Sequence, residues 1–157
     1  MQQTVHRPPS LSGSLSVPGD KSVSHRSLIL NSIARGDALV TGLSGGDDVQ
    51  STMRCLQAMG ARIEPGEQPG TVSVSGPGQG LQEPADILDA GNSGTSMRLL
   101  SGLLAAQPFV SVLTGDSSLR SRPMGRVVQP LKQMGAQIMG RSDDSLAPLT
   151  IRGGSLR

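Results

Sequence analysis

The 157-residue chain has almost no aromatic side chains and a single cysteine. Phe109 is its one aromatic residue, so a core has to be built from aliphatic residues and the seven methionines. Cys55 alone excludes an intramolecular disulfide framework. Because the two histidines, His6 and His25, are too far apart to form a ligand pair of short helical spacing, we also expect no metal site.

Long hydrophobic runs are absent as well. The most apolar stretch, residues 99–106, is interrupted by Ser101 and Gly102 and is far shorter than the roughly 20 residues that cross a bilayer. Residues 1–9 contain no apolar signal core. These patterns predict a cytoplasmic protein with no membrane partner.

Charge is sparse and unevenly distributed. Charged residues make up 17% of the chain and the formal net charge is +2. Residues 47–89 are rich in acidic side chains, whereas residues 91–142 carry six basic ones against Asp116 alone. Since there are no aromatic platforms on which bases could stack, this basic region suits a small anionic ligand at least as well as a polyanion. We expect no nucleic-acid partner.

Glycine and proline are abundant, with 21 and 11 residues, and they separate segments that repeat after about 75 positions. The clearest match aligns residues 56–63 with residues 131–138. Each copy reads β-α-β-α-β-β, in about 14–77 and about 85–153, after an N-terminal segment of residues 1–13. The expected fold class is therefore α/β with mixed strand pairing.

The elements follow from hydrophobic periodicity and turn residues. Helices are predicted at residues 21–34, 48–59, 93–106 and 123–134. Strands are predicted at residues 14–19, 38–41, 72–76, 85–91, 110–114 and 149–153. Asp20 and Asn92 stand where N-caps belong, Pro123 suits the first helical position, and Pro130 should kink or break its helix.

The first predicted helix begins with a group of residues suited to an anion. Ser22 and Arg26 are four residues apart and share one helical face, with Lys21 beside them. A hydroxyl, an ammonium, a guanidinium and the free N–H groups of the helix start would converge on a phosphate or carboxylate. The alternative is a capped helix whose Lys21 and Arg26 are solvated.

The second copy supplies glycines in place of the lysine. Gly94 would let a ligand approach the backbone closely, and Arg98 lies on an otherwise apolar helix. The alternative for Arg98 is a buried guanidinium neutralised by Asp86 or Asp89.

A third polar segment, residues 114–123, ends at a helix start and carries two arginines. Arg122 is well placed to bind an anion, and for Arg120 we expect solvation. His25 is interpreted as a helix-face residue rather than a base, and Cys55 as a packing residue. No hydrolytic triad or dinucleotide fingerprint is present.

Three motifs together resemble those of the 5-enolpyruvylshikimate-3-phosphate synthases, within the enolpyruvyl transferases. They are residues 15–28, residues 91–98 and residues 122–124, in the family's order and at its separations. The resemblance implies two inside-out α/β domains, each built from three β-α-β-α-β-β units. It also implies transfer of an enolpyruvyl group from phosphoenolpyruvate to shikimate 3-phosphate, without a cofactor, at a site where glyphosate competes.

The resemblance also implies roles for individual residues. Lys21 would contact both substrates, with shikimate 3-phosphate held further by Ser22 and Arg26. Gly94 and Arg122 would bind phosphoenolpyruvate. The residues expected to support that pocket are Asn92, Thr95 and Arg98. No catalytic residue is identified.

Some positions depart from the family pattern: Asp20 replaces a common serine, His25 a common asparagine and Leu99 a common proline. Members of the family are also more than twice as long, so the chain resembles an N-terminal portion. We expect it to be inactive alone, with the remaining C-terminal portion a candidate partner chain.

Two alternatives remain at this point. One is a fragment of a UDP-N-acetylglucosamine enolpyruvyl transferase, whose catalytic cysteine is not found in residues 115–121. The other is a non-catalytic phosphate-binding subunit.

Overall fold

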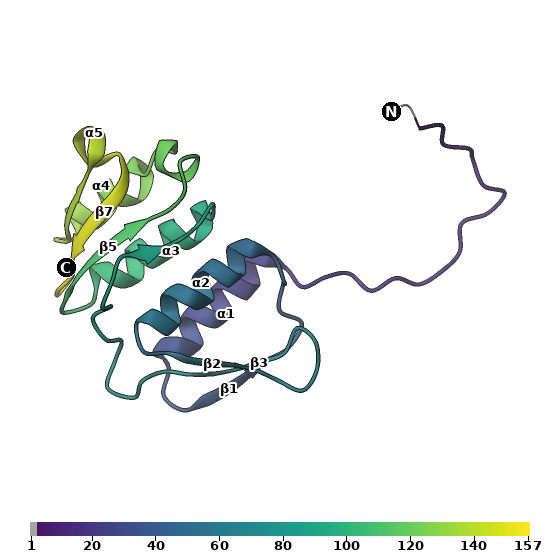
Figure 1. Cartoon of the computed structure of the whole chain (residues 1–157), viewed down its shortest axis with the longest axis horizontal. Coiled ribbons are helices and arrows are strands. Elements are labelled where there is room, and N and C mark those ends of the chain that lie inside the picture. Colours follow the sequence, from purple (N-terminus) through teal and green to yellow (C-terminus); the bar gives the residue numbers. More distant parts are fainter. Residues whose placement is uncertain (1–2) are drawn as a thin grey trace.

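Two small sheets with helices packed against them form the body of the molecule, which a computed structural model describes for residues 3–157 (Figure 1). The antiparallel first sheet has the order β1 (Asp37–Val40), β3 (Val72–Ser75), β2 (Arg62–Pro65). The second has the order β4 (Leu88–Asp89), β5 (Val110–Thr114), β7 (Leu146–Arg152), β6 (Gln137–Gly140). Only the β4–β5 pair is parallel in these sheets.

Helices pack against both sheets and against one another. Those beside the first sheet are α1 (Lys21–Ile33) and α2 (Asp47–Ala58). Those beside the second are α3 (Gly94–Ala105) and α4 (Gly125–Gln133). Two short segments are the single turn η1 (Leu119–Ser121) and α5 (Arg141–Asp144), whose backbone is left-handed at Ser142 and Asp143 (φ 49° and 52°). Because α3 also contacts α1 and α2, it joins the two sheets into one body (Figure 1).

The repeat in the sequence produces the same turn twice. The Ala61 N–H donates to the Leu56 carbonyl at 3.1 Å, and the Ala136 N–H donates to the Leu131 carbonyl at 2.9 Å. The glycine before each of these alanines has a positive φ, 89° in one copy and 100° in the other, which favours glycine. The α/β class with repeated units is confirmed, in two open sheets. The unit bounds, about 14–77 and about 85–153, stay a prediction.

The core is aliphatic, with methionines filling the places where aromatic residues would often stand. Leu28, Met59 and Met97 are fully buried, and one apolar cluster runs through both sheets and all four long helices. Phe109 only packs against the edge of this cluster. Buried side chains alternate along β7, with Leu149 among them, so one face of the second sheet is closed.

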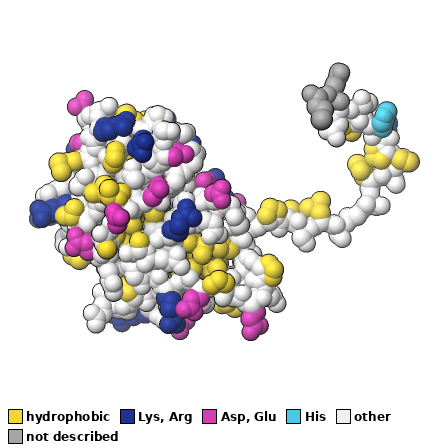
Figure 2. Space-filling model, in the orientation of Figure 1, with side chains coloured by type: hydrophobic (Ala, Val, Ile, Leu, Met, Phe, Trp, Pro, Cys, Tyr) yellow, Lys and Arg dark blue, Asp and Glu magenta, His cyan; other side chains and the backbone are white. Residues whose placement is uncertain are grey.

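The strand predicted at residues 14–19 is wrong. Residues 3–20 form no helix or strand, and most of this segment extends away from the body (Figures 1 and 2). Leu15 and Val17 are 83% and 77% exposed. A strand requires a hydrogen-bonded neighbour, and this segment pairs with no strand among residues 3–157. In the second copy, the corresponding strand is reduced to β4.

Three local predictions also need correction. Ser93, not Asn92, caps α3, because its hydroxyl accepts the Ser96 N–H. Helix α4 starts at Gly125 rather than Pro123, and Pro130 does not break it, since it continues to Gln133. Its backbone N–H groups at Val127 and Val128 donate to the Met124 carbonyl, which places the helix start after the proline.

Within residues 3–157, every helix is too short or too polar to cross a membrane.

Candidate functional site

The N-terminal ends of three helices meet at one end of the body. Helix α2 lies between the other two, since Asp48 in its first turn contacts both. The Asp48 carboxylate accepts from Lys21 Nζ at 2.8 Å, and the Asp48 carbonyl accepts from the Ser96 hydroxyl at 3.0 Å. The starts of α1 and α3 therefore flank the start of α2. Their partial positive charges favour an anion.

At α1, the predicted residues occupy the exposed side of the first turns. Asp20 is the N-cap, as expected, and its carboxylate accepts the Val23 N–H at 2.7 Å. Ser22 and Arg26 lie on the same exposed face, and Arg26 Nη1 donates to the Ser22 carbonyl at 3.1 Å. Lys21 is held by its ion pair with Asp48 rather than being fully solvated.

At α3, two guanidinium groups converge on Gly94. A Cβ atom placed on Gly94 would lie 2.7 Å from Arg98 Nη1 and 3.5 Å from Arg122 Nη1. Arg98 is exposed and donates to the carbonyls of Gly94 and Pro123, at 3.2 and 3.4 Å. The alternative of a buried Arg98 neutralised by Asp86 or Asp89 is therefore wrong.

A short series of hydrogen bonds holds Arg122 beside α3. Arg122 Nη2 donates to Asn92 Oδ1 at 2.6 Å, and Asn92 Nδ2 donates to Asp116 Oδ2 at 2.6 Å. The hydrogen bond from Asn92 is the main cause that lowers the pKa of Asp116, followed by the Leu119 N–H and, after the opposing effect of desolvation, the Arg122 charge. The carboxylate thus orients Asn92, and Asn92 orients the guanidinium.

Lys21 is paired with Asp48, but the guanidinium groups beside the starts of α1 and α3 have no such partner in the described part of the chain. Among residues 3–157, Arg26, Arg98 and Arg122 form no ion pair with a carboxylate. Arg120 is half-buried and donates to the Gly115 carbonyl at 2.9 Å, so its guanidinium is only partly solvated. Three available guanidiniums beside free helix N–H groups form a site for oxyanions.

The predicted site residues thus fall into two groups. The α1 group comprises Lys21, Ser22 and Arg26. The α3 group comprises Asn92, Gly94, Arg98 and Arg122. Thr95 is half-buried in the first turn of α3, and no hydrogen bond of its side chain is found within residues 3–157.

Sequence reasoning missed the two carboxylates that orient these groups, Asp48 and Asp116. The available signal for Asp48 was its position just after Gly45 and Gly46, at another predicted helix start.

Cys55 lies behind this surface and is buried, as expected for a packing residue, and His25, expected on a helix face, is buried there as well. Burial raises the pKa of the Cys55 thiol to about 12, so it is no nucleophile near neutral pH. Burial is also the main cause that lowers the pKa of His25. Of its charged neighbours, Asp48 opposes this shift, while Lys21 and Arg26 add to it.

This shift predicts a pH-dependent stability. Below about pH 6.5 the unfolded chain takes up a proton at His25 before the folded chain does. The free energy of unfolding should therefore decrease as the pH is lowered through that range, by at most about 1.4 kcal/mol per pH unit. Denaturant titrations at pH 7.5 and 5.5 should show the loss in the wild type and not in His25→Asn. An equal loss in both would contradict the prediction.

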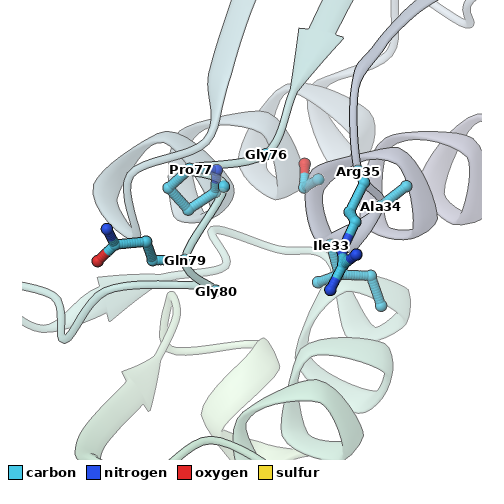
Figure 3. Close-up of a pocket in the computed structure, with 9 residues that line it drawn as sticks. Ile33, Ala34, Arg35, Gly76, Pro77, Gln79 and Gly80 are labelled. Atoms are coloured by element: carbon cyan, nitrogen blue, oxygen red, sulfur yellow. The ribbon is translucent and has the colours of Figure 1, made fainter.

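The protein also has a hollow at the opposite end of α1, away from the helix starts (Figure 3). It has a volume of about 340 Å³ and lies between Ile33, Arg35 and the glycine-rich segment 76–80. Arg35 is the one charged residue that lines it, and none of the predicted site residues does. The site at the helix starts is therefore an open surface rather than this hollow.

Comparison with known proteins decides between the enolpyruvyl transferase families that the motifs left open. The model of the family EPSP synthase (3-phosphoshikimate 1-carboxyvinyltransferase) matches residues 5–157. The chain belongs to the EPSP synthase family. A solved EPSP synthase from Acinetobacter baumannii superposes with a TM-score of 0.85 at 51% identity, covering 90% of this chain and 32% of that one.

Curated relatives agree with this assignment. The chain is 55% identical over 154 residues to a 3-phosphoshikimate 1-carboxyvinyltransferase of Herpetosiphon aurantiacus. It is 56% identical over 155 residues to that of Chloroflexus aurantiacus. In both comparisons 98% of this chain matches 35% of the relative. The chain thus spans about a third of the length of these EPSP synthases.

Proposed function

We propose that this chain provides the phosphate-binding part of a 3-phosphoshikimate 1-carboxyvinyltransferase. The observation that carries the proposal is the convergence of Arg98 and Arg122 on Gly94, with no carboxylate partner among residues 3–157. Phosphoenolpyruvate would bind there, at Gly94, Arg122 and Lys21. The residues that would support this pocket are Asn92, Thr95 and Arg98.

Shikimate 3-phosphate would bind at the start of α1, at Lys21, Ser22 and Arg26. Arg26 and Ser22 share an exposed face, so a phosphate could accept hydrogen bonds from both side chains. Lys21 is the residue shared by the two substrates, and its ion pair with Asp48 places it on the α2 side of this site.

The proposed reaction moves an enolpyruvyl group from phosphoenolpyruvate to a hydroxyl of shikimate 3-phosphate and releases phosphate. Two phosphorylated acids repel each other when they approach, so one task of the site is to offset that repulsion. The ammonium and guanidinium groups at the starts of α1 and α3 supply opposite charge without protein carboxylates competing for Arg26, Arg98 and Arg122.

Proton transfer has no assigned residue in this chain. His25 is buried behind the site, the pKa of Cys55 is about 12, and Asp48 is paired with Lys21. We therefore propose that turnover needs residues beyond these 157. A separate chain carrying the remaining two thirds of an EPSP synthase is a candidate partner.

The test is calorimetric titration of the purified chain with shikimate 3-phosphate and phosphoenolpyruvate, together with a phosphate-release assay. We expect binding of the substrates and no turnover. Adding a chain that corresponds to the rest of an EPSP synthase should tighten binding and start phosphate release. Turnover by the 157-residue chain alone would overturn the expected inactivity.

Inorganic phosphate is the control ligand in this experiment. A general phosphate-binding subunit would bind inorganic phosphate as well as it binds the two substrates and would gain nothing from the added chain. That outcome would favour the non-catalytic alternative.

A further inference from the structure

Directly behind the helix starts lies a buried series of polar side chains that the proposed function does not use. His25 Nδ1 lies 2.8 Å from Thr52 Oγ1, and Thr52 Oγ1 lies 2.7 Å from Ser96 Oγ. Ser96 Oγ lies 2.7 Å from the hydroxyl of Ser93, the N-cap of α3. All four residues are 0% exposed. The series crosses from α1 through α2 to α3.

The hydroxyl hydrogens determine the direction of this series. Ser96 has one hydroxyl hydrogen, and the Asp48 carbonyl at 3.0 Å can only accept, so Ser96 donates to this carbonyl. Thr52 must therefore donate to Ser96, and its own oxygen accepts from His25. If Ser96 instead donated to Thr52, the Ser96 and Asp48 oxygens would face each other without a proton between them.

It follows that His25 carries its proton on Nδ1. Its other ring nitrogen, Nε2, is then a buried acceptor, and it has no hydrogen-bond partner among residues 3–157. An unpaired buried acceptor is costly, so an apolar residue would serve packing better at this place. The position is therefore better explained by the hydrogen bond that Nδ1 donates than by burial alone.

We propose that His25, Thr52, Ser96 and Ser93 are positioning residues that fix the start of α1 relative to the start of α3. This rests on the proposed function, because the two starts hold the two substrates. Arg26 follows His25 directly in α1, and Ser96 lies between Gly94 and Arg98 in α3. In α1 and in α3, the exposed side would thus bind the ligand, while the buried side forms hydrogen bonds to α2.

Asp48 connects this network to the surface. Its carbonyl accepts from Ser96, and its carboxylate holds Lys21, the residue proposed to touch both substrates. Hydrogen bonds are directional, whereas apolar contacts allow helices to slide, so a polar network defines one arrangement of the helix starts. A substitution at Thr52 should therefore alter the structure at the start of α1 and at the start of α3.

The decisive variants are Thr52→Val and Thr52→Ser. Valine keeps the volume of threonine and removes both hydrogen bonds, whereas serine keeps the hydroxyl and loses a methyl group. A packing role predicts that serine does more harm, and a positioning role predicts that valine does. Ser101→Ala is the matched control, since Ser101 is also buried in α3 but, within residues 3–157, its hydroxyl bonds only to the Met97 carbonyl of its own helix.

The first measurement needs no ligand. Amide NMR spectra of Thr52→Val should show shifted resonances for Ser22 and for Gly94, at both helix starts. Thr52→Ser and Ser101→Ala should leave these resonances in place. Shifts of Thr52→Val confined to the neighbours of residue 52 would overturn the proposal.

The second measurement is the affinity for shikimate 3-phosphate and for phosphoenolpyruvate by calorimetry. Thr52→Val should weaken both by roughly five- to tenfold, and Thr52→Ser should retain both. Equal affinities of the valine variant and the wild type would overturn the proposed positioning role. If the wild type bound neither substrate, the proposed function would fail, while the NMR result would still decide whether the network sets the helix starts.

Discussion

Arg122→Ala is expected to weaken phosphoenolpyruvate binding by roughly ten- to a hundredfold, because one charge-assisted contact to an anion contributes about 1.5–3 kcal/mol. The Arg122 guanidinium approaches Gly94 and forms no ion pair within residues 3–157, so its charge is available to a ligand. Calorimetric titration of phosphoenolpyruvate measures the loss. Shikimate 3-phosphate, which we place at the start of α1, should lose much less affinity.

Two controls separate a specific contact from net charge. Arg126→Ala removes an exposed guanidinium from α4, the next helix, and Arg126 has no hydrogen bond or ion pair in the described part of the chain. This variant should bind both ligands as the wild type does. Arg122→Lys keeps the charge and loses the planar fork, so an intermediate affinity is expected. Equal losses in Arg126→Ala and Arg122→Ala would contradict the assignment of Arg122.

Most of the helices were predictable from the sequence because their signals are local. Helix α1 begins where Asp20 caps it and ends one residue before the predicted bound. Strand β5 matches its prediction at residues 110–114. The strand predicted at residues 14–19 is absent because a strand depends on a non-local signal. An alternating pattern shows only that a segment could pair, and the pairing partner has to come from another part of the fold.

The candidate site was predictable only in part. Helix starts and family motifs identified the residues that face solvent, such as Arg26 and Arg98. The residues that orient them are distant in sequence, and no spacing rule connects them. Lys21 and Asp48 are 27 positions apart, and Thr52 and Ser96 are 44 apart. Only the packing of α1, α2 and α3 against one another brings these pairs together.

Gly94→Ala is the second change with a large expected effect, and it should separate the two substrates. The added methyl carbon would lie 2.7 Å from Arg98 Nη1 and 3.5 Å from Arg122 Nη1, so it would displace the first group and crowd the second. It would also cover the free N–H groups at the start of α3. We expect phosphoenolpyruvate affinity to fall by roughly tenfold or more, given the charge-assisted contacts affected.

Folding should tolerate this substitution, which makes the result interpretable. Gly94 is the first residue of α3, the closest atom to the new carbon belongs to the flexible end of a side chain, and alanine favours a helix more than glycine does. The free energy of unfolding should therefore stay the same or rise slightly, and shikimate 3-phosphate should bind as before. Loss of both ligands together would show that α1 and α3 form one undivided anion site rather than two adjoining ones.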